Sequence, residues 1–523
     1  MQQNISLRLL PSEAASTDII KEYIASATGK KPADISGFYI LKQSVDARSK
    51  TAHVNLTCKA FINEPFHDRE IRLIEFRDVH AARQEAIIAG AGPAGLFAAL
   101  KLIEHGIRPV ILERGKDVRA RRRDLAALNK EGIINPESNY CFGEGGAGTY
   151  SDGKLYTRST KRGDVNRILN LLVQFGAEEN ILYHSHPHIG TNKLPQIITS
   201  MRRQITQSGG KFLFEKKVTE LLITNNVIEG VQTADGEIFK TGIVILATGH
   251  SARDIFTLLD RKKIQIHFKP FALGVRIEHP QTLIDSIQYH NSNRGPFLPP
   301  AAYSLVQQVQ DHGVFSFCMC PGGIIAPAST AAGEIVVNGW SPSRRNNPFA
   351  NSGIVINIEE NDVKTFSRYG ALAGLHFQQK VEQDAFNAGG GKFVAPAQRM
   401  MDFINKKVSA TLPDCSYLPG IRPYPLNKVL PDFVFRALQL AFLEFGKKMK
   451  GYLTNDAVVV ATESRTSSPV RIPRDPVTLE HPQVGGLYPA GEGAGYAGGI
   501  VSAAMDGERI AQCIIEKYNH VSL

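Results

Sequence analysis

The chain has 523 residues, of which 43% are hydrophobic and 21% charged, and 60 Lys and Arg against 50 Asp and Glu give a formal net charge of +10. This composition is typical of globular proteins and excludes a disordered chain, a collagen-like repeat and a coiled coil, and the length predicts about two to four domains. The basic balance leaves three kinds of partner open: nucleic acid, a membrane surface or an anionic small molecule.

The cysteines and the start of the chain bear on the compartment. Six cysteines are scattered along the chain without the spacing of a disulfide framework, which favours a reducing compartment. The first residues lack the basic, apolar and small-residue order of a secretory signal. The most membrane-like stretch, residues 86–100, is shorter than the ~20 residues of a membrane span and contains three Gly and a Pro. We expect a cytoplasmic protein with no membrane partner. The sequence does not indicate an oligomeric state.

Residues 1–82 have a pattern of their own. Residues 5–10 alternate as a strand, residues 17–29 have helical spacing and end on Gly29, and residues 37–62 indicate two strands around a polar turn. A further strand is expected over residues 71–76. This order predicts a small N-terminal α+β domain of ferredoxin-like type, for which we expect no chemistry of its own.

From residue 85 the pattern changes to strand, glycine turn, helix and strand. A strand-rich block follows around residues 211–249, and a last strand–helix unit covers residues 486–515. The residues between these blocks have strands and amphipathic helices of their own. We predict an α/β protein whose discontinuous Rossmann-type domain spans 83–260 and 455–523, with an inserted α+β substrate domain over 261–454.

The first glycine motif has the full context of a dinucleotide site. Gly90, Gly92 and Gly95 follow an apolar strand, precede a helical segment and meet Glu113 at the end of the next strand. In this arrangement the glycines permit the tight turn, the approach of a pyrophosphate and the packing of helix on strand. Glu113 would bind a free ribose hydroxyl and repel a 2′-phosphate, so we expect FAD or NAD rather than NADP. The residues predicted here are Gly90, Gly92, Pro93, Ala94, Gly95 and Glu113.

A second glycine run, residues 143–154, has neither the strand nor the helix of a Rossmann turn. A helix N-terminus offers only about half a positive charge, which is too little for a diphosphate, so further donors are needed. A long loop of Gly, Thr, Ser and Lys is suited to wrap an extended cofactor with its backbone amides. The predicted contacts are Arg114, Gly145, Gly146, Ala147, Gly148, Thr149, Ser151, Asp152, Gly153 and Lys154. Arg119 and residues 121–123 are expected on a solvated helix face.

The third glycine motif, residues 493–498, is not a complete nucleotide site, because no acidic residue ends a following strand. It resembles the second FAD signature of glutathione-reductase-type flavoproteins, in which an acid binds ribitol and a helix N-terminus faces the flavin. Most of those proteins have Asp where this chain has Glu492. Residues 242–249 are similar to the strand by which such chains return beside the FAD. The resemblance adds Val218, Ala247, Thr248, Gly249, Gly491, Glu492, Gly499, Ile500 and Val501 to the predicted FAD site.

Longer motifs sharpen this resemblance. The segments GEGGAGTYSDGKL, KPFALGVRIEHPQ, SFCMCPGG and ESRTSSPVRIPRD, with others along the whole chain, resemble the bacterial FAD-dependent dehydrogenase family. That family is related to flavoproteins of the geranylgeranyl-reductase and bile-acid-reductase type. The resemblance implies a glutathione-reductase-type fold and bound FAD, and it implies no substrate.

In a flavoenzyme the flavin ring transfers the hydride while protein groups place the substrate. The sequence does not single out a catalytic residue, and the candidates are His188, His250, Cys318, Cys320 and Arg465. The two cysteines are either redox-active or ordinary core residues. A core role is favoured because a regular strand points both sulfurs to one face without the turn of a CxxC motif.

Two other groups of residues are open to more than one interpretation. His184, His186 and His188 alternate as metal ligands do, but no Cys or acidic partner lies near them in the sequence, so no metal is predicted. Arg276 and Arg465 either clamp an acidic substrate or form structural salt bridges.

Three functions remain open. The first is an FAD oxidoreductase that dehydrogenates or reduces a small organic molecule between the FAD-binding and inserted domains. The second is an FAD-dependent RNA-modifying or RNA-binding flavoprotein that uses the N-terminal domain and the basic helix around residues 113–124. The third is an FAD-loaded binding protein without turnover. No second complete Rossmann unit is present, so NAD(P)H is expected only as a transient electron donor.

Overall fold

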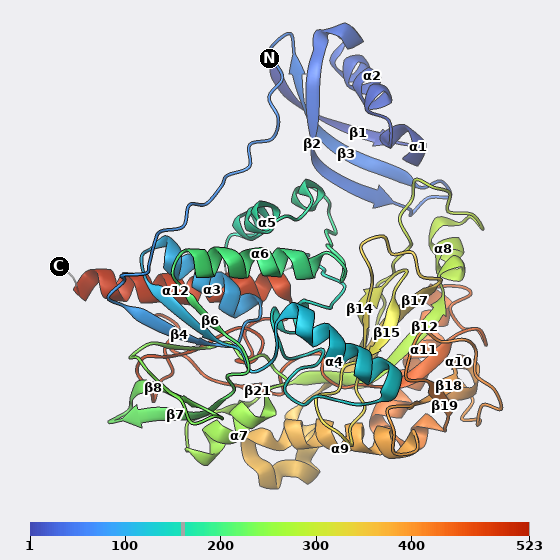
Figure 1. Cartoon of the computed structure of the whole chain (residues 1–523). Helices are drawn as coiled ribbons and strands as arrows, with labels where there is room; N and C mark the ends of the chain where they lie inside the picture. The colour runs from blue at the N-terminus through green and yellow to red at the C-terminus, as the bar shows by residue number, and fades with distance from the viewer. Residues whose placement is uncertain (158–162, 522–523) are drawn as a thin grey trace.

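The structure, a computed structural model, describes residues 1–157 and 163–521. Its N-terminal unit is a three-stranded antiparallel sheet with a helix packed on one face, and it forms a lobe of its own above the rest of the molecule (Figure 1). The elements are β1 (Gln2–Leu9), α1 (Pro11–Ala14), α2 (Thr17–Thr28), β2 (Ile35–Asp46) and β3 (His53–Ile62). The order β1-β3-β2 places the third strand between two parallel ones, as in the first half of a ferredoxin-like fold.

Helix α2 ends as the sequence predicts, since Gly29 follows its last residue with a φ of 66°. The predicted strand over residues 71–76 is wrong: this segment hydrogen-bonds to no neighbouring strand and runs as an extended connection to the body of the protein. The N-terminal unit instead attaches through β2, where the backbone of Gln43 exchanges hydrogen bonds with Tyr183 and Ser185.

The body contains a five-stranded parallel sheet in the order β22-β10-β4-β5-β6. Its strands are β4 (Glu85–Ala89), β5 (Arg108–Leu112), β6 (Lys211–Leu213), β10 (Val244–Leu246) and β22 (Leu487–Pro489). Both faces are covered, because Ile88 packs into one core cluster and its neighbour Ile87 into another. Burial on both sides explains why these strands are almost continuously apolar.

Helices cover one face of the parallel sheet, and a small antiparallel sheet covers the other (Figure 1). The helices on the first face are α3 (Pro93–Glu104), α5 (Val165–Gln174), α6 (Leu194–Gln207) and α12 (Ile500–Val521). The elements on the second face are β7 (Val218–Thr224), β8 (Val227–Thr233), β9 (Ile238–Lys240) and α7 (Arg253–Arg261). Helix α4 (Val118–Glu131) lies between the parallel sheet and the rest of the body.

The second large sheet has seven strands in the order β13-β14-β17-β12-β20-β18-β19. They are β13 (Val306–Val309), β14 (His312–Cys320), β17 (Phe349–Ile358), β12 (Phe271–Pro280), β20 (Val458–Glu463), β18 (Ala395–Arg399) and β19 (Ile421–Pro423). Its helices are α8 (Gln281–Tyr289), α9 (Ala373–Ala388), α10 (Met400–Ile404) and α11 (Asp432–Lys448). Two short ribbons complete the body, β11 (His267–Phe268) with β21 (Val470–Arg471) and β15 (Ile324–Pro327) with β16 (Val337–Trp340).

The predicted α/β fold class is confirmed, since β22 enters the parallel sheet beside β10 after the chain has built the seven-stranded sheet. The domain limits stay a prediction, with one change that we propose. Strand β20 lies beyond residue 455 but pairs with β12 and β18, so the inserted domain would extend to about residue 463.

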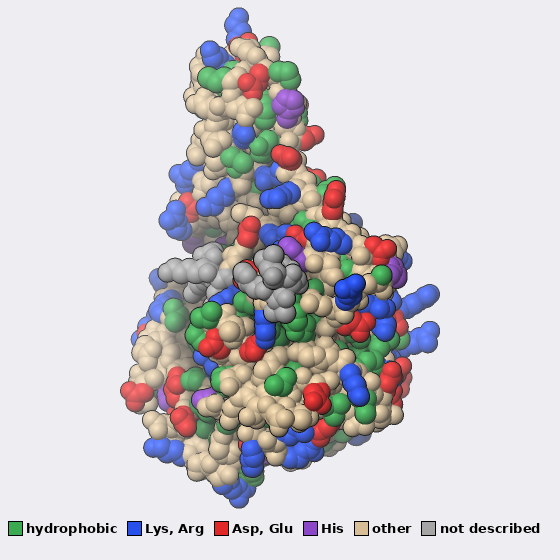
Figure 2. Space-filling model, turned by 90° about the vertical axis from the view of Figure 1, so that its left-hand side faces the viewer, with side chains coloured by type: hydrophobic (Ala, Val, Ile, Leu, Met, Phe, Trp, Pro, Cys, Tyr) green, Lys and Arg blue, Asp and Glu red, His purple; other side chains and the backbone are tan. Residues whose placement is uncertain are grey.

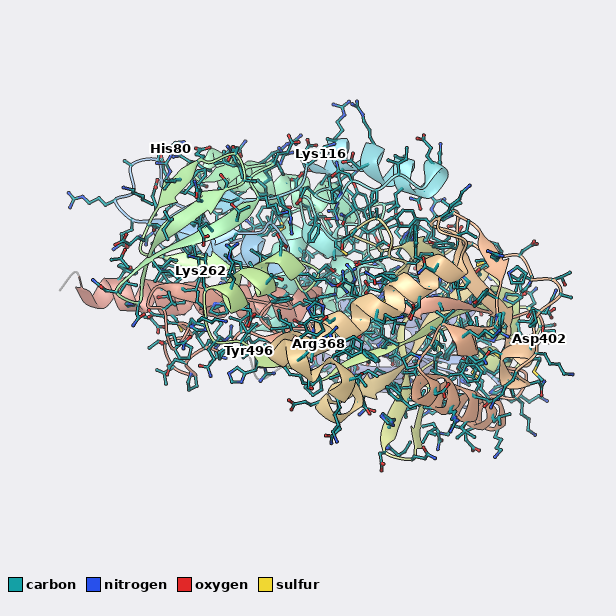
Figure 3. All side chains as sticks on the ribbon, turned by 90° about the horizontal axis from the view of Figure 1, so that it is seen from below. His80, Lys116, Lys262, Arg368, Asp402 and Tyr496 are labelled. Atoms are coloured by element: carbon teal, nitrogen blue, oxygen red, sulfur yellow. The ribbon has the colours of Figure 1, made fainter. Side chains whose placement is uncertain are left out.

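From below, Lys262 and Tyr496 lie on the side of the parallel sheet, and Asp402 lies at the far end of the seven-stranded unit (Figure 3). The N-terminal unit forms a narrow lobe above a broader body, and on the face shown Lys and Arg side chains are interspersed with Asp and Glu (Figure 2). No helix in the described part of the chain has the length and apolar character to cross a membrane.

Candidate functional site

A cavity of about 400 Å³ opens at the carboxyl edge of the parallel sheet. The ends of β4, β5, β10 and β22 all contribute to its lining, and β14 and β16 of the opposite unit close it from the other side. Parallel α/β sheets bind ligands outside the carboxyl ends of their strands. The position is therefore the one expected for a nucleotide.

Most of the residues predicted to bind the cofactor line this cavity. They are Gly90, Gly92, Pro93, Ala94, Glu113, Arg114, Gly146, Ala147, Gly148, Ser151, Asp152, Gly153, Lys154, Val218, Ala247, Thr248, Gly249, Gly491, Glu492, Gly499 and Ile500. Four predicted residues do not line it: Gly95, Gly145, Thr149 and Val501. Gly145 and Thr149 shape the loop instead, since Gly145 donates to the Ala91 carbonyl and Thr149 donates to the Glu144 carbonyl.

Glycine is present at the three positions of the first motif for different physical reasons. Gly90 has a φ of 106°, and a Cβ there would collide with the Ala247 carbonyl. A Cβ on Gly95 would collide with the carbonyl of Gly90. At Gly92 the nearest atom to an added Cβ is the Cα of Gly146, at 4.0 Å. Protein packing therefore requires Gly90 and Gly95, whereas Gly92 leaves room that faces the cavity at the start of α3.

Glu113 is buried and holds the turn together. Its Oε2 accepts a hydrogen bond from the Ala91 amide, and its Oε1 accepts from the amides of Gly115 and Gly143, each at 2.9 Å. A carboxylate oxygen has two lone pairs, so Oε2, which accepts one hydrogen bond from the protein, keeps one acceptor position, and Glu113 lines the cavity. The carboxylate thus joins the first glycine turn to the second glycine loop and can still accept from a ligand hydroxyl.

Arg114 lines the cavity with its charge already paired. Its guanidinium donates to Glu137 and, through two nitrogens, to Asp254, and it lies 4.2 Å from the centre of the Phe142 ring. Lys217 also contacts Glu137 and Asp254. These contacts make Arg114 part of the cavity wall rather than an unpaired cation that awaits a diphosphate.

The second glycine loop is anchored by Arg121, which was predicted to lie on a solvated helix face. That prediction is wrong, because Arg121 is fully buried. Its guanidinium donates to the carbonyls of Asn139, Tyr140, Glu144 and Gly146 at 2.7 to 2.9 Å. Burial lowers the pKa of this guanidinium from its usual range. The helical spacing could have revealed it, since Val118, Arg121, Leu125 and Leu128 form the buried face of α4.

The C-terminal glycine segment brings a second helix N-terminus to the cavity. A Cβ on Gly498 or Gly499 would meet no atom within 4 Å, and Ile500 begins α12. The Gly491 amide donates to Asp506, which also pairs with Arg474. Two helices, α3 and α12, therefore direct their partly positive N-termini into one cavity.

Among the five candidate catalytic residues, His250, Cys318 and Arg465 line the cavity, and His188 and Cys320 do not. His250 lies between Glu492, at 3.2 Å, and the Arg465 carbonyl, at 3.1 Å. His188 lies behind Lys154, with which it forms a backbone bridge, and burial, followed by the charge of Arg345, lowers its pKa to about 4.

The two arginines considered as a substrate clamp are both engaged in ion pairs. Arg465 binds Glu382 and Glu334, and Arg276 binds Glu463 at 2.6 Å. The structure therefore favours the salt-bridge interpretation. Within the described residues, no three His, Cys, Asp or Glu side chains gather as metal ligands would.

Sequence reasoning missed several residues of the cavity wall. Lys216, Lys217 and Asp254 line it near Glu113, and Phe317 and Asn338 line it from the opposite unit. Phe317 and Asn338 carry no local signal, because only the folded chain brings their strands to the parallel sheet. Thr466, which follows the candidate Arg465 directly in the sequence, also lines the cavity.

Matches to known families agree with this geometry. Residues 270–466 match the family described as FAD-dependent protein, C-terminal domain-like, and residues 83–126 match an FAD binding domain. Residues 195–313 match glucose inhibited division protein A, and residues 1–61 match a domain of unknown function. An uncharacterized protein of Clostridium beijerinckii is 39% identical over 520 residues, which cover 96% of each chain.

Solved structures give only distant likenesses. The 2,6-dihydroxypyridine-3-hydroxylase of Arthrobacter nicotinovorans is 11% identical, with 84% of each chain covered and a TM-score of 0.36. The glycine oxidase of Bacillus cereus is 13% identical, with 84% of this chain and 97% of that chain covered and a TM-score of 0.31.

The family matches confirm the predicted FAD-binding fold, the resemblance to FAD-dependent proteins and the choice of FAD as cofactor. Because FAD carries out redox chemistry, this protein belongs to the general class of FAD-dependent oxidoreductases. The residues that contact FAD, and NAD(P)H as an electron donor, remain predictions.

Proposed function

Since this chain belongs to a family of FAD-dependent proteins, we propose that it transfers a hydride between bound FAD and a small organic molecule. The observation that supports this most is the shared cavity, which receives the ends of four parallel strands on one side and residues of the seven-stranded unit on the other. When bound, FAD would supply the hydride chemistry, and the protein would place the substrate.

The lining residues suit an extended dinucleotide. Gly92 and Gly499 have no protein atom where a side chain would begin, and each stands at the N-terminus of a helix that favours negative charge. Glu113 keeps an acceptor position for a ribose hydroxyl. We assign the diphosphate to Gly92 and the facing Gly146 loop, and the flavin to the end formed by Gly499 and Lys154.

The substrate would lie between the parallel sheet and the seven-stranded sheet. Phe317, Cys318, Asn338 and Thr466 line the cavity from that second unit, and His250 lies beside Glu492 at the same cavity. We propose transient NAD(P)H as the electron donor. The direction of the reaction, dehydrogenation or reduction, is left to the experiment.

Gly92→Asp tests the cofactor site. Gly92 is the N-cap of α3 with an extended backbone, and Asp is a favoured N-cap residue, so the helix should persist. The new carboxylate would fill and negatively charge the space assigned to the diphosphate. Purified wild-type protein should be yellow and release FAD on denaturation, whereas Gly92→Asp should retain less than about a tenth of that FAD, a loss of at least ~1.4 kcal/mol of binding free energy.

Gly242→Asp is the matched control. Gly242 is exposed, has no left-handed φ and has no atom within 4 Å of an added Cβ, so this variant should keep its FAD. A colourless wild-type protein that cannot be reconstituted with FAD would overturn the proposal. Anaerobic bleaching of the bound flavin by NADH or NADPH, followed by reoxidation with candidate substrates, separates an enzyme from an FAD-loaded binding protein.

The RNA hypothesis gains nothing from α4. Arg121 is buried, and only Arg119, Arg122 and Arg123 of the predicted basic surface are exposed there. We therefore keep the small-molecule proposal.

A further inference from the structure

Strand β14 contains an irregularity that brings two sulfur atoms together. Its pairing with β17 shifts register between Phe317 and Cys320, and Cys318 has a φ of 45°, in the left-handed region that non-glycine residues seldom adopt. In a regular strand, residues two apart are separated by roughly 7 Å. Here the Sγ atoms of Cys318 and Cys320 are 3.9 Å apart. The bulge therefore brings the two thiols close together, which a CxC pair in a regular strand would not achieve without a turn.

Two cations lie against this pair. Lys154 Nζ is 3.7 Å from the Sγ of Cys318 and 3.6 Å from the Sγ of Cys320. Arg276 Nη2 is 3.7 Å from the Cys320 Sγ and donates to the Cys318 carbonyl at 2.6 Å. The Cys320 thiol also lies 3.2 Å from that carbonyl. Positive charge at this distance stabilises a thiolate.

Carboxylates also face the pair, and they are themselves paired. Asp152 lies 3.5 Å from Lys154 and 3.1 Å from Arg345, and Glu463 lies 2.6 Å from Arg276. Burial raises the pKa of Glu463 to about 7, against the opposing effect of Arg276. The hydrogen bond from Cys320, then Lys154 and Arg276, holds the pKa of Cys318 well below its usual range, and burial raises that of Cys320.

The two sulfurs differ in access. Cys318 lines the large cavity together with Lys154, whereas Cys320 is fully buried and does not line it. An accessible thiolate beside an interior thiol is the arrangement that forms and breaks a disulfide. Cys58 and Cys415 differ, because burial raises the pKa of each thiol.

We propose that Cys318 and Cys320 form a redox-active pair that exchanges two electrons with the FAD bound in the same cavity. This inference rests on the proposed function, because FAD is the oxidant. When the Cys318 thiolate and the Cys320 thiol are oxidised, an S–S bond forms, Cys320 loses its proton and two electrons leave the sulfurs. Bound FAD would supply the acceptor for both electrons and that proton. The reverse step breaks the S–S bond and restores the thiolate and the thiol.

The first test needs no flavin and measures the thiolate directly. Iodoacetamide is added at pH values between about 5 and 9, and the alkylation rate of each cysteine is followed by mass spectrometry. At pH 7 we expect Cys318 to react about tenfold faster than Cys513, whose thiol pKa is raised by burial. Lys154→Met should move the midpoint of the Cys318 profile to higher pH. A Cys318 profile that rises only in the range of an ordinary thiol would overturn the inference.

The second test counts electrons in the FAD-loaded protein. After oxidation with a thiol oxidant, anaerobic titration with dithionite should consume about twice as many electrons per FAD in the wild type as in Cys318→Ser or Cys320→Ser. Cys513→Ser, which removes a thiol near the Val477 carbonyl outside the cavity, should titrate as the wild type does.

The two outcomes separate this inference from the proposed function. A wild-type protein with normal bound flavin that consumes no more electrons than the serine variants would overturn the cysteine pair and leave the FAD proposal standing. A protein that binds no FAD would overturn the FAD proposal, while the alkylation profile would still report the thiolate.

Discussion

The two sides of the cavity are built on different principles. The glycine wall, formed by Gly90, Gly92, Gly249, Gly491 and Gly499, presents backbone and helix N-termini. The charged wall consists of Lys154, Cys318 and Arg465, which line the cavity, together with the ion pairs Arg276–Glu463 and Arg465–Glu382 that hold them from behind; its side chains are mostly buried. The glycine wall has room and partial charges, whereas the charged wall has full charges already paired.

This difference shows where function and stability are separable. The space beside Gly92 is not filled by protein atoms and adds nothing to protein packing. A bound ligand would explain why this space is kept open. In the charged wall each ion has a protein partner, and a buried ion left without its partner is strongly destabilising. We therefore expect changes at Gly92 and Gly499 to affect FAD first, and changes in the charged wall to affect folding first.

Arg465→Met should have the largest effect on stability. Arg465 donates to Glu382 at 2.8 and 3.0 Å, to Glu334 at 3.0 Å and to Thr330 at 2.6 Å. Burial alone would raise the pKa of Glu382, but Arg253 and Arg465 bring it down to about 2. Removal of Arg465 leaves these two carboxylates with Arg253 as the one cation that pairs with them among the described residues, so the free energy of unfolding in urea should fall by ~3–5 kcal/mol.

The control for Arg465→Met is an exposed ion pair. Lys380 contacts Asp384 four residues along α9, and Lys380→Met should change the unfolding free energy by no more than ~0.5 kcal/mol. Arg465→Lys keeps the charge without the forked donors and should lie between the two. If Arg465→Met lowered the free energy of unfolding as little as Lys380→Met does, the charged wall would not be a stabilising network.

Arg121→Met tests the anchor of the second glycine loop. The substitution removes the guanidinium donors to the carbonyls of Asn139, Tyr140, Glu144 and Gly146. Thr149 still donates to the carbonyls of Glu144 and Gly146. We expect unfolding to become easier by about 3 kcal/mol, because hydrogen bonds to a charged group contribute about 1.5–3 kcal/mol each and the loop can partly relax. Thermal unfolding measures the loss, and Arg123→Met on the exposed face of α4 is the control. Equal melting temperatures for the two variants would contradict the anchoring role.

The same contrast explains what the sequence could predict. The glycine wall was predictable, because the turn at Gly90 and the room at Gly92 are requirements of local backbone at fixed spacing. The charged wall was not, because Arg276 and Glu463 are 187 residues apart and a strand sequence does not name its neighbours. Arg121 was only partly predictable. Its helical spacing places it on the apolar face of the helix, but its charge led to the prediction of a solvent-exposed side chain. The bulge at Cys318 depends on pairing with β17 and left no local signal.

The smallest expected effect is that of Glu113→Gln, and it tests which part of FAD meets the glycine wall. Gln has one acceptor oxygen, so it cannot accept from Ala91, Gly115 and Gly143 and also from a ribose hydroxyl. The affinity for FAD, measured by fluorescence titration of the apoprotein, should fall about tenfold, which corresponds to ~1.4 kcal/mol. Glu444→Gln on the exposed side of α11 should bind FAD as the wild type does.

FMN sharpens this last experiment, because it contains the flavin and a phosphate but lacks the adenosine ribose. If Glu113 binds that ribose, Glu113→Gln should weaken FAD and leave the affinity for FMN unchanged. If both affinities fell together, Glu113 would act by holding Ala91 and Gly143 in place rather than by contact with the nucleotide. In that case the glycine wall, like the charged wall, would depend on a buried carboxylate whose partners are all within the protein.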